Sequence, residues 1–127
     1  MKVLVIDDNQ DLSELIKAML EHLSYIVICA KTGGEGVEKA ALEKPDLILM
    51  DIMMPGMSGW EATRLLRTKP DTKDVPILAM TALSSQAKID ACFEAGCTEY
   101  LLKPFALSDL RERVQRLLAE TTAQRTN

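Results

Sequence analysis

Five short apolar segments alternate with five longer segments whose apolar residues recur at helical spacing. The short segments, rich in Val, Ile and Leu and bounded by polar or turn residues, are typical of buried β-strands. The longer segments place apolar residues three and four positions apart, as amphipathic helices do. This alternation predicts an α/β fold, a parallel sheet with helices on both faces and right-handed crossovers. The expected strands are about 2–6, 25–30, 47–51, 76–81 and 98–103, and the expected helices about 10–23, 32–44, 58–67, 84–96 and 107–120.

Polar residues mark where several of these helices begin and end. Thr32 with Glu35, and Ser58 with Glu61, have the spacing of capping boxes, in which each side chain satisfies a free N–H group of the first helical turn. Gly96 follows the fourth helix and is expected to adopt the left-handed conformation that ends many helices. These signals predict helix starts at residues 32 and 58 and a helix end at Gly96.

The length of 127 residues suits one domain and is short for two. We expect the domain to cover residues 1–120, with residues 121–127 as a polar, frayed C-terminal tail. The formal net charge of −4 argues against bulk nucleic-acid binding, which requires a basic surface. No apolar run approaches the roughly 20 residues that cross a bilayer, so no membrane association is expected.

The cysteines and the N-terminal residues favour a cytoplasmic protein. Cys29, Cys92 and Cys97 are odd in number and lack metal-ligand spacing, so we interpret them as reduced thiols. The chain reaches Asp7 and Asp8 too early for a secretory signal peptide.

The central stretch of the sequence, residues 47–59, ends an apolar strand with a carboxylate. Four apolar residues precede Asp51, and a loop containing Pro55, Gly56 and Gly59 follows it. This pattern predicts a central strand with Asp51 at its carboxyl end. Open α/β sheets bind their ligands at that edge.

Polar residues follow four of the five strands, and in a parallel sheet they would meet at one edge. They are Asp7 and Asp8, Asp51, Thr81 and Lys103. Like charges held so close are costly unless one carboxylate takes a proton or a cation lies among them. Hard oxygen ligands of this kind suit Mg²⁺. A carboxylate held by a metal within reach of a lysine can accept a phosphoryl group and form an acyl phosphate.

Each of these residues also has a structural interpretation. Asp51 alone could cap a helix or close a loop, and Asp7 and Asp8 could complement a helix N-terminus. Thr81 suits a strand by propensity, and a lysine such as Lys103 is usually solvated. The predicted site would be absent only if all of these structural interpretations were correct at once.

Taken in order along the chain, these motifs resemble the receiver domain of two-component response regulators. The resemblance rests on Asp7-Asp8, the Asp51 loop, Thr81-Ala82 and Lys103-Pro104-Phe105, and it covers about residues 2–120. It implies a flavodoxin-like (βα)5 fold with strand order 2-1-3-4-5, of the single-domain type found among chemotaxis and cell-cycle regulators. It also implies that Asp51 takes phosphate from a phosphohistidine on a sensor histidine kinase or histidine phosphotransfer protein.

The resemblance assigns metal ligands residue by residue. It implies that Asp8, Asp51 and the backbone carbonyl of Met53 hold Mg²⁺, with Mn²⁺ as a substitute, and that Asp7 acts mostly through a metal-bound water. Met53 is one of four methionines near Asp51 whose side chains we otherwise expect to fill gaps in the core. The others are Met50, Met54 and Met57.

The resemblance also assigns the phosphate contacts and a conformational switch. Thr81 and the backbone N–H of Ala82 would bind phosphoryl oxygens, and Lys103 would pair with them. Tyr100 stands at the switch position, where its ring would turn inward behind Thr81 and remodel the surface of the fourth helix, fifth strand and fifth helix. A cis Lys103–Pro104 peptide bond is implied as well.

Two apolar positions bear on the lifetime of the phosphoryl group, and two polar positions on its donor. By the resemblance, Met53 and Leu83 stand at two positions that tune such sites; polar side chains there could orient an attacking water and apolar ones would exclude it, so we expect slow hydrolysis without an outside phosphatase. By the resemblance, the first helix docks the donor, which makes Gln10 and Glu14 candidates for partner choice.

Three classes of function remain at this point. The leading one is a phosphorylation-switched module that controls an output protein or passes phosphate on, as a monomer or weak dimer and not as a multiple-turnover enzyme. The alternative is a Mg²⁺-dependent phosphatase or phosphotransferase with an aspartyl nucleophile, but Asp51-Ile52-Met53 lacks the second acid that such enzymes present. The third is a degenerate receiver that serves as a scaffold, disfavoured because every expected site residue is present.

Overall fold

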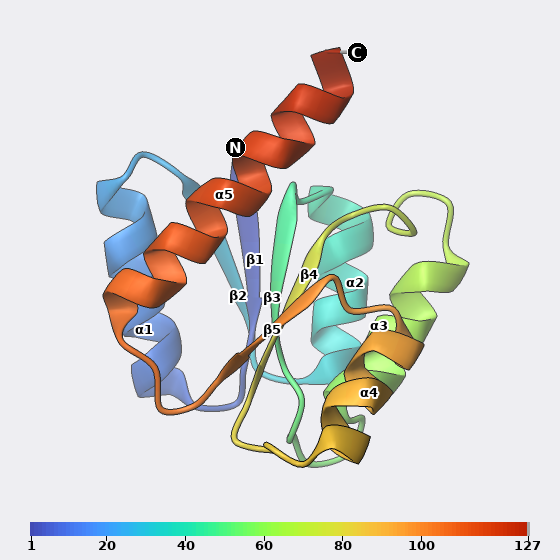
Figure 1. The fold of residues 1–127 in the computed structure, drawn as a ribbon. Coiled ribbons are helices and arrows are strands. Elements are labelled where there is room, and N and C mark those ends of the chain that lie inside the picture. The colour runs from blue at the N-terminus through green and yellow to red at the C-terminus, as the bar shows by residue number, and fades with distance from the viewer. Residues whose placement is uncertain (127) are drawn as a thin grey trace.

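The computed structural model describes residues 1–126, with side chains described through residue 123. Five strands form one sheet in the order β2-β1-β3-β4-β5, and all neighbouring strands are parallel. This is the expected flavodoxin-like, doubly wound arrangement (Figure 1). The elements are β1 (Lys2–Ile6), α1 (Gln10–His22), β2 (Ile26–Ala30), α2 (Gly33–Glu43), β3 (Leu47–Asp51), α3 (Gly59–Thr68), β4 (Ile77–Thr81), α4 (Gln86–Ala95), β5 (Glu99–Leu102) and α5 (Leu107–Thr126).

The helices cover the two faces of the sheet unequally, and each face has its own core. Helices α1 and α5 lie on one face, and α2, α3 and α4 on the other (Figure 1). Because successive strand residues point to opposite faces, β1 sends Leu4 and Ile6 toward α2 and α3, and Val3 and Val5 toward α1 and α5. Every residue of β3 and β4 is buried, which explains why four consecutive apolar residues precede Asp51 in β3 and Thr81 in β4.

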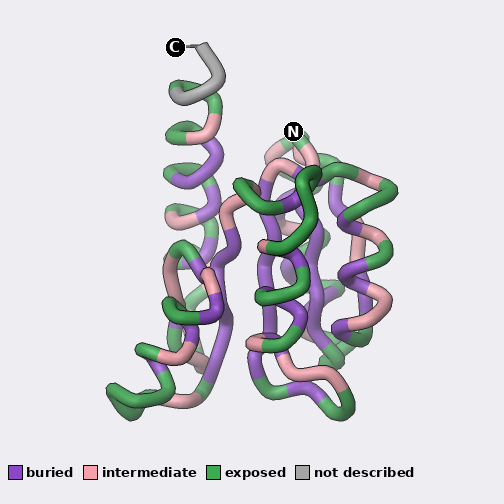
Figure 2. Tube along the Cα trace, turned by 90° about the vertical axis from the view of Figure 1, so that its right-hand side faces the viewer, coloured by how far each residue is buried: buried purple, intermediate pink, exposed green. Residues whose placement is uncertain are grey.

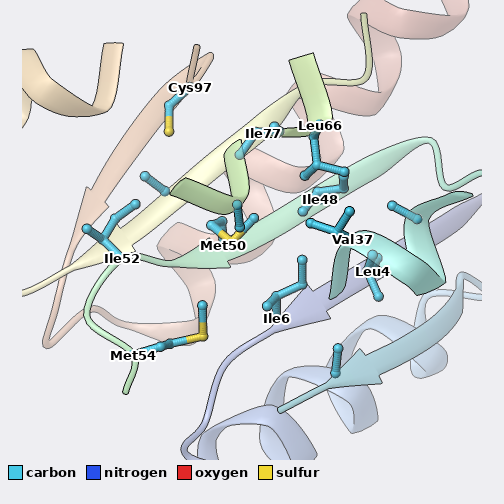
Figure 3. Close-up of a cluster of buried hydrophobic side chains, with 14 of the residues drawn as sticks. Leu4, Ile6, Val37, Ile48, Met50, Ile52, Met54, Leu66, Ile77 and Cys97 are labelled. Atoms are coloured by element: carbon cyan, nitrogen blue, oxygen red, sulfur yellow. The ribbon is translucent and has the colours of Figure 1, made fainter. Parts of the chain in front are cut away.

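The burial pattern along the chain separates sheet from helices. Figure 2 shows the central strands as continuous buried traces, whereas the helices alternate between buried and exposed turns. In the core on the α2–α4 face, Met50 and Met54 fill space beside Ile48 and Ile52 (Figure 3). Met57 packs against the same cluster, so three of the four methionines near Asp51 pack as expected.

The predicted helix caps are present. Thr32 and Ser58 accept hydrogen bonds from the backbone N–H groups of Glu35 and Glu61, at 3.1 and 3.2 Å. Gly96 has φ of +114° and ends α4, as its position in the sequence indicated. These local signals fixed the helix ends because each satisfies backbone groups that would otherwise be left unpaired.

The last helix differs from expectation. Helix α5 continues to Thr126 instead of ending at residue 120, and in Figure 1 it projects well beyond the sheet. The apolar repeat ends at Leu118, but no glycine or proline follows it, and the hydroxyls of Thr121 and Thr122 bond to carbonyls one turn back. The expected end of this helix at residue 120 is therefore wrong, whereas the division into a domain over residues 1–120 and a polar tail over 121–127 stays a prediction; Asn127 lies outside the described residues. Within residues 1–126, no helix combines the length and apolar character that crossing a bilayer requires.

Candidate functional site

Asp51 stands at the end of β3 because the loop that follows turns away at once. Its exposed fraction is 5%, and its Oδ1 accepts a hydrogen bond from the Met53 backbone N–H at 3.3 Å. Gly56 allows the turn, since its φ is +76°. Gly59 then brings the start of α3 back against the strand end, where its N–H donates to the Ile52 carbonyl at 2.9 Å.

Two further carboxylates lie beside Asp51, as the strand ends predicted. One oxygen from each of Asp7, Asp8 and Asp51 lies within 4.8 Å of the others. Asp7 follows β1 and is 1% exposed, whereas Asp8 is exposed. Asp7 is fixed by its Oδ1, which accepts the backbone N–H of Asn9 at 2.8 Å. Three acids of different burial thus form one cluster at the carboxyl edge of the sheet.

Lys103 reaches this cluster from the end of β5. Its Nζ lies 3.0 Å from Asp7 Oδ2 and 3.5 Å from Asp51 Oδ1. Its own backbone N–H donates to the Thr81 carbonyl at 2.8 Å, and the peptide bond to Pro104 is cis, as the resemblance implied. One ammonium group therefore bridges two buried carboxylates.

The charge on Asp51 is poorly compensated. Burial, and next the negative charge of Asp7, raise the pKa of the Asp51 carboxyl to about 7, with a hydrogen bond to Asp8 acting in the same direction. Lys103 and the Met53 N–H act in the opposite direction but do not cancel the increase. An additional cation among the three acids would favour the ionised form.

The donor set fits Mg²⁺. Three carboxylates supply hard oxygen ligands in the small number that Mg²⁺ takes from a protein, which leaves positions for water and a phosphate oxygen. Burial, and next the charge of Asp7, keep the pKa of Asp51 raised despite Lys103, so the ionised carboxyl would gain from an added cation. Asp7, Asp8 and Asp51 are therefore the residues that could hold the ion.

Thr81 and Ala82 lie at the same edge without joining the acidic cluster. Thr81 is buried at the end of β4, and its Oγ1 accepts the Leu83 backbone N–H at 3.0 Å, which holds it within its own loop. Ala82 and Lys103 help to line a cavity of about 330 Å³ whose other walls come from the start of α1 and from Pro104 and Phe105. The Thr81 hydroxyl and the carboxylates thus come from the neighbouring strands β1, β3 and β4, at one edge of the sheet.

Tyr100 lies on β5, and its ring is half-buried against Phe93 of α4. The two ring centroids are 5.9 Å apart in an edge-to-face arrangement. Both residues line a cavity of about 460 Å³ between α4, β5 and α5, where Arg113 donates to the Tyr100 carbonyl at 3.1 Å. This side of the molecule presents an open, partly apolar surface.

The two apolar positions near Asp51 differ in exposure. Met53 is 58% exposed in the loop after Asp51, so the expectation that its side chain fills a core gap is wrong. Leu83 is partly buried and packs against the core on the α2–α4 face. At the first helix, Gln10 and Glu14 bond to each other at 3.2 Å and are exposed.

Sequence reasoning missed two contacts around the site. Gly59 was recognised only as a turn residue, but a Cβ there would overlap the Asp51 carbonyl oxygen and lie 2.6 Å from Ile52 Cα. Phe93 had no special signal, because its contact with Tyr100 joins two elements whose relative position the sequence does not encode locally.

Comparisons with known proteins agree on one family. The family model described as "Response regulator receiver domain" matches residues 3–115. Response regulator MprA of Mycolicibacterium vanbaalenii is 39% identical over 121 residues, which cover 95% of this chain and 52% of that protein. The MprA of Mycobacterium leprae matches with the same identity and coverage. The chain therefore spans about half the length of the curated relatives it matches.

Solved structures give the same fold. Chemotaxis protein CheY4 of Vibrio cholerae superposes with a TM-score of 0.87 at 33% identity, covering 91% of this chain and 97% of that one. The receiver domain of the sensor histidine kinase PA1611 of Pseudomonas aeruginosa superposes with a TM-score of 0.85 at 36% identity, covering 93% and 97%. That structure has a magnesium ion coordinated in its active-site cleft.

Proposed function

The chain belongs to the response regulator receiver domain family, and we propose that it accepts a phosphoryl group on Asp51. The observation that carries the proposal is the cluster of Asp7, Asp8 and Asp51 bridged by Lys103 at the carboxyl edge of the sheet. A buried carboxylate surrounded by other acids and one lysine suits a site that gains phosphate and a divalent cation together.

In the proposed reaction, an Asp51 carboxylate oxygen attacks the phosphorus of a phosphohistidine. A P–O bond to Asp51 forms as the P–N bond to the donor imidazole breaks, and the electron pair returns to the imidazole nitrogen. Bound Mg²⁺, or Mn²⁺ in its place, would offset the negative charge of the phosphoryl oxygens and carboxylates. Asp8, Asp51 and the Met53 carbonyl would hold the ion directly, and Asp7 through a bound water.

Lys103 has the second electrostatic role. Its ammonium already lies 3.5 Å from Asp51, so it can pair with a phosphoryl oxygen attached there. Thr81 would turn its hydroxyl from the Leu83 N–H toward the phosphate, and the Ala82 N–H would donate to a second oxygen. These contacts bind and orient the group that Asp51 receives.

The same rotation of Thr81 would link the site to a surface. Tyr100 would turn inward behind Thr81, which would alter the face formed by α4, β5 and α5 where the half-buried ring now contacts Phe93. An output protein would distinguish the two states of that face, or the phosphate would pass on in a phosphorelay. The donor would be a sensor histidine kinase or histidine phosphotransfer protein docking at α1. A cytoplasmic location fits the three free thiols.

Acetyl phosphate labelling tests the proposal. With Mg²⁺, the protein should gain the mass of one phosphoryl group, and a chelator should abolish the gain. Asp51→Asn should take no label, whereas Asp71→Asn, an exposed acid elsewhere on the chain, should be labelled like the parent protein. Equal labelling of Asp51→Asn and the parent would contradict the assignment of Asp51. Sustained turnover of a small phosphomonoester would favour the phosphatase alternative instead.

The lifetime of the phosphoryl group is a further part of the proposal. Exposed Met53 offers no polar group to orient a water, and neither does Leu83. We expect Met53→Asn with Leu83→Glu to hasten loss of the label on the order of tenfold, the effect of about 1.4 kcal/mol on the barrier. The decay is timed by intact mass after acetyl phosphate is removed. Leu42→Gln, an equally apolar-to-polar change on exposed α2, is the control; an unchanged rate in the double variant would contradict slow hydrolysis through water exclusion.

A further inference from the structure

The turn that ends α4 brings two cysteines together. Gly96 N–H donates to the Phe93 carbonyl at 3.0 Å, and Cys97 N–H donates to the Cys92 carbonyl at 3.0 Å. This pair of bonds around a left-handed glycine is a Schellman motif, in which the side chains at the two ends are often in contact. Here they are, because besides burial a side-chain hydrogen bond with Cys92 is among the causes that raise the pKa of Cys97. Those ends are usually apolar residues, but here both are thiols.

Helix α3 holds the two thiols against one of its turns. Trp60 Nε1 donates to Cys92 Sγ at 3.4 Å, and Thr63 Oγ1 shares a hydrogen bond of 3.8 Å with Cys97 Sγ. Trp60 and Thr63 are three residues apart and so lie on one side of α3. Both cysteines are buried, with exposed fractions of 2% and 6%, and Figure 3 shows Cys97 at the margin of the core.

We propose that Cys92 and Cys97 are a reversible redox pair that closes into a disulfide when a hydroperoxide reaches it. One thiol sulfur attacks the peroxide, the O–O bond breaks, and a sulfenic acid and one water or alcohol form. The second sulfur then displaces the sulfenic oxygen as water, and the S–S bond forms. Two thiols lose two electrons and two protons in total, and the hydroperoxide takes them up. This inference does not depend on the proposed phosphorylation.

Burial makes the reaction slow in the closed fold. It raises the pKa of the Cys97 thiol to about 11, so little thiolate is present at neutral pH. Oxidation then requires the end of α4 to separate transiently from α3, and the rate should rise with pH. Cys29 is not a competitor, because it lies on β2 against the opposite face of the sheet.

The disulfide would constrain a residue of the α4–β5–α5 surface. Phe93 lies between the two cysteines in sequence and packs edge-to-face on Tyr100. A covalent link across the Schellman turn would hold the last turn of α4, and Phe93 with it, in its present position beside β5. Oxidation would thus limit changes on this surface by a route separate from Asp51.

Mapping the oxidised protein tests the pair. After treatment of the folded chain with hydrogen peroxide, we expect a mass loss of two hydrogens, and alkylation after denaturation should modify one cysteine instead of three. A protease that cleaves after Glu94 should leave two peptides joined through Cys92 and Cys97, which separate on reduction. Cys29→Ser, the matched control, should form the same link.

The outcomes are distinct. Three alkylated cysteines after peroxide, a link that includes Cys29, or a link between chains would each overturn the proposal. Hydrogen exchange tests the mechanical consequence: amides at the end of α4 should exchange more slowly after oxidation and recover on reduction. Unchanged exchange in a protein that carries the disulfide would overturn the claim that the link restrains Phe93.

Discussion

Among single residues, Asp51 lowers the folding stability of the metal-free protein when its carboxyl is ionised, because it is buried and lies beside Asp7. Its pKa is raised in the folded state, so the folded chain binds a proton between about pH 4 and 7 that the unfolded chain has released. Stability from this residue therefore falls as the pH rises through that range. Above about pH 7 the Asp51 carboxyl is ionised in the folded state as well, and its unfavourable contribution to folding stability has reached its full value.

Asparagine in place of Asp51 carries no charge, so it removes this unfavourable contribution to folding stability. We expect Asp51→Asn to stabilise the metal-free protein by about 4 kcal/mol at pH 7.5 and by only about 1 kcal/mol at pH 4.5, from ~1.4 kcal/mol per pKa unit over a rise of about three units. Urea denaturation with a chelator at both pH values measures this, with Asp71→Asn as the control for a solvated acid. A gain that is equal at the two pH values would contradict the charge explanation.

Gly59 is required by the close approach of α3 to the end of β3. We expect Gly59→Ala to destabilise the fold by about 1–3 kcal/mol, since the added methyl group must displace backbone atoms of Asp51 and Ile52. Labelling by acetyl phosphate should also slow, because the Asp51 backbone shifts. Gly34→Ala, where a Cβ meets nothing within 4 Å, is the matched control and should be stable to denaturant like the parent.

The sequence predicted which residues gather at the site, but it predicted only some of the contacts between them. Asp7, Asp8, Asp51 and Lys103 lie together because each follows a strand of one parallel sheet, which the apolar pattern predicted. That Lys103 bridges Asp7 and Asp51 depends on side-chain geometry between distant strands. The exposure of Met53 was not predicted either, because a sequence gives no sign that an apolar residue in a loop faces solvent instead of the core.

At the scale of elements, Arg67 joins α3 to two neighbouring segments. Its guanidinium donates to the carbonyls of Thr72, Lys73 and Val75 in the following loop and to Gly96 at the end of α4. Burial lowers the pKa of this group, and the four carbonyls surround it with acceptors. One side chain thus fixes both a loop without regular structure and the turn before β5.

Loss of Arg67 should loosen both segments together. We expect Arg67→Met to cost about 2–4 kcal/mol, because buried carbonyls lose a charged donor. Chemical denaturation measures the loss, and hydrogen exchange should rise in residues 69–76 and near Gly96. Arg64→Met on the exposed side of the same helix should change little. A similar cost for both variants would assign the effect to helix α3 as a whole.

The ends of the helices agree with the sequence-based prediction where a nearby side chain caps the helix. The caps at Thr32 and Ser58 act within one turn, so pattern and structure agree. The end of α5 had no such signal: the apolar repeat stopped at Leu118, but a helix continues where nothing breaks it, and Thr121 and Thr122 are compatible with it. Apolar periodicity reports the packed part of a helix and not its full length.

At the scale of the whole molecule, a bound cation should stabilise the fold. A ligand that binds only the folded state raises its stability by RT ln(1 + [L]/Kd), about 1.4 kcal/mol at ten times Kd. We expect Mg²⁺ to raise the midpoint of thermal unfolding and a chelator to lower it again. Asp8→Asn should reduce this response; Asp71→Asn should not. A shift of the same size in both variants would point to ions bound outside the acidic cluster.

Of the five strands, β1 leaves the ribosome before the others, yet it lies between β2 and β3 and has only one neighbouring strand until residue 51 has emerged. Lys103 emerges later still, after all five strands of the sheet have been synthesised. We therefore expect nascent fragments to expose an unpaired edge of β1 while lacking the ammonium group that bridges Asp7 and Asp51. Prematurely terminated chains should aggregate or be degraded, and should not compete with the complete domain for the phosphodonor that we propose.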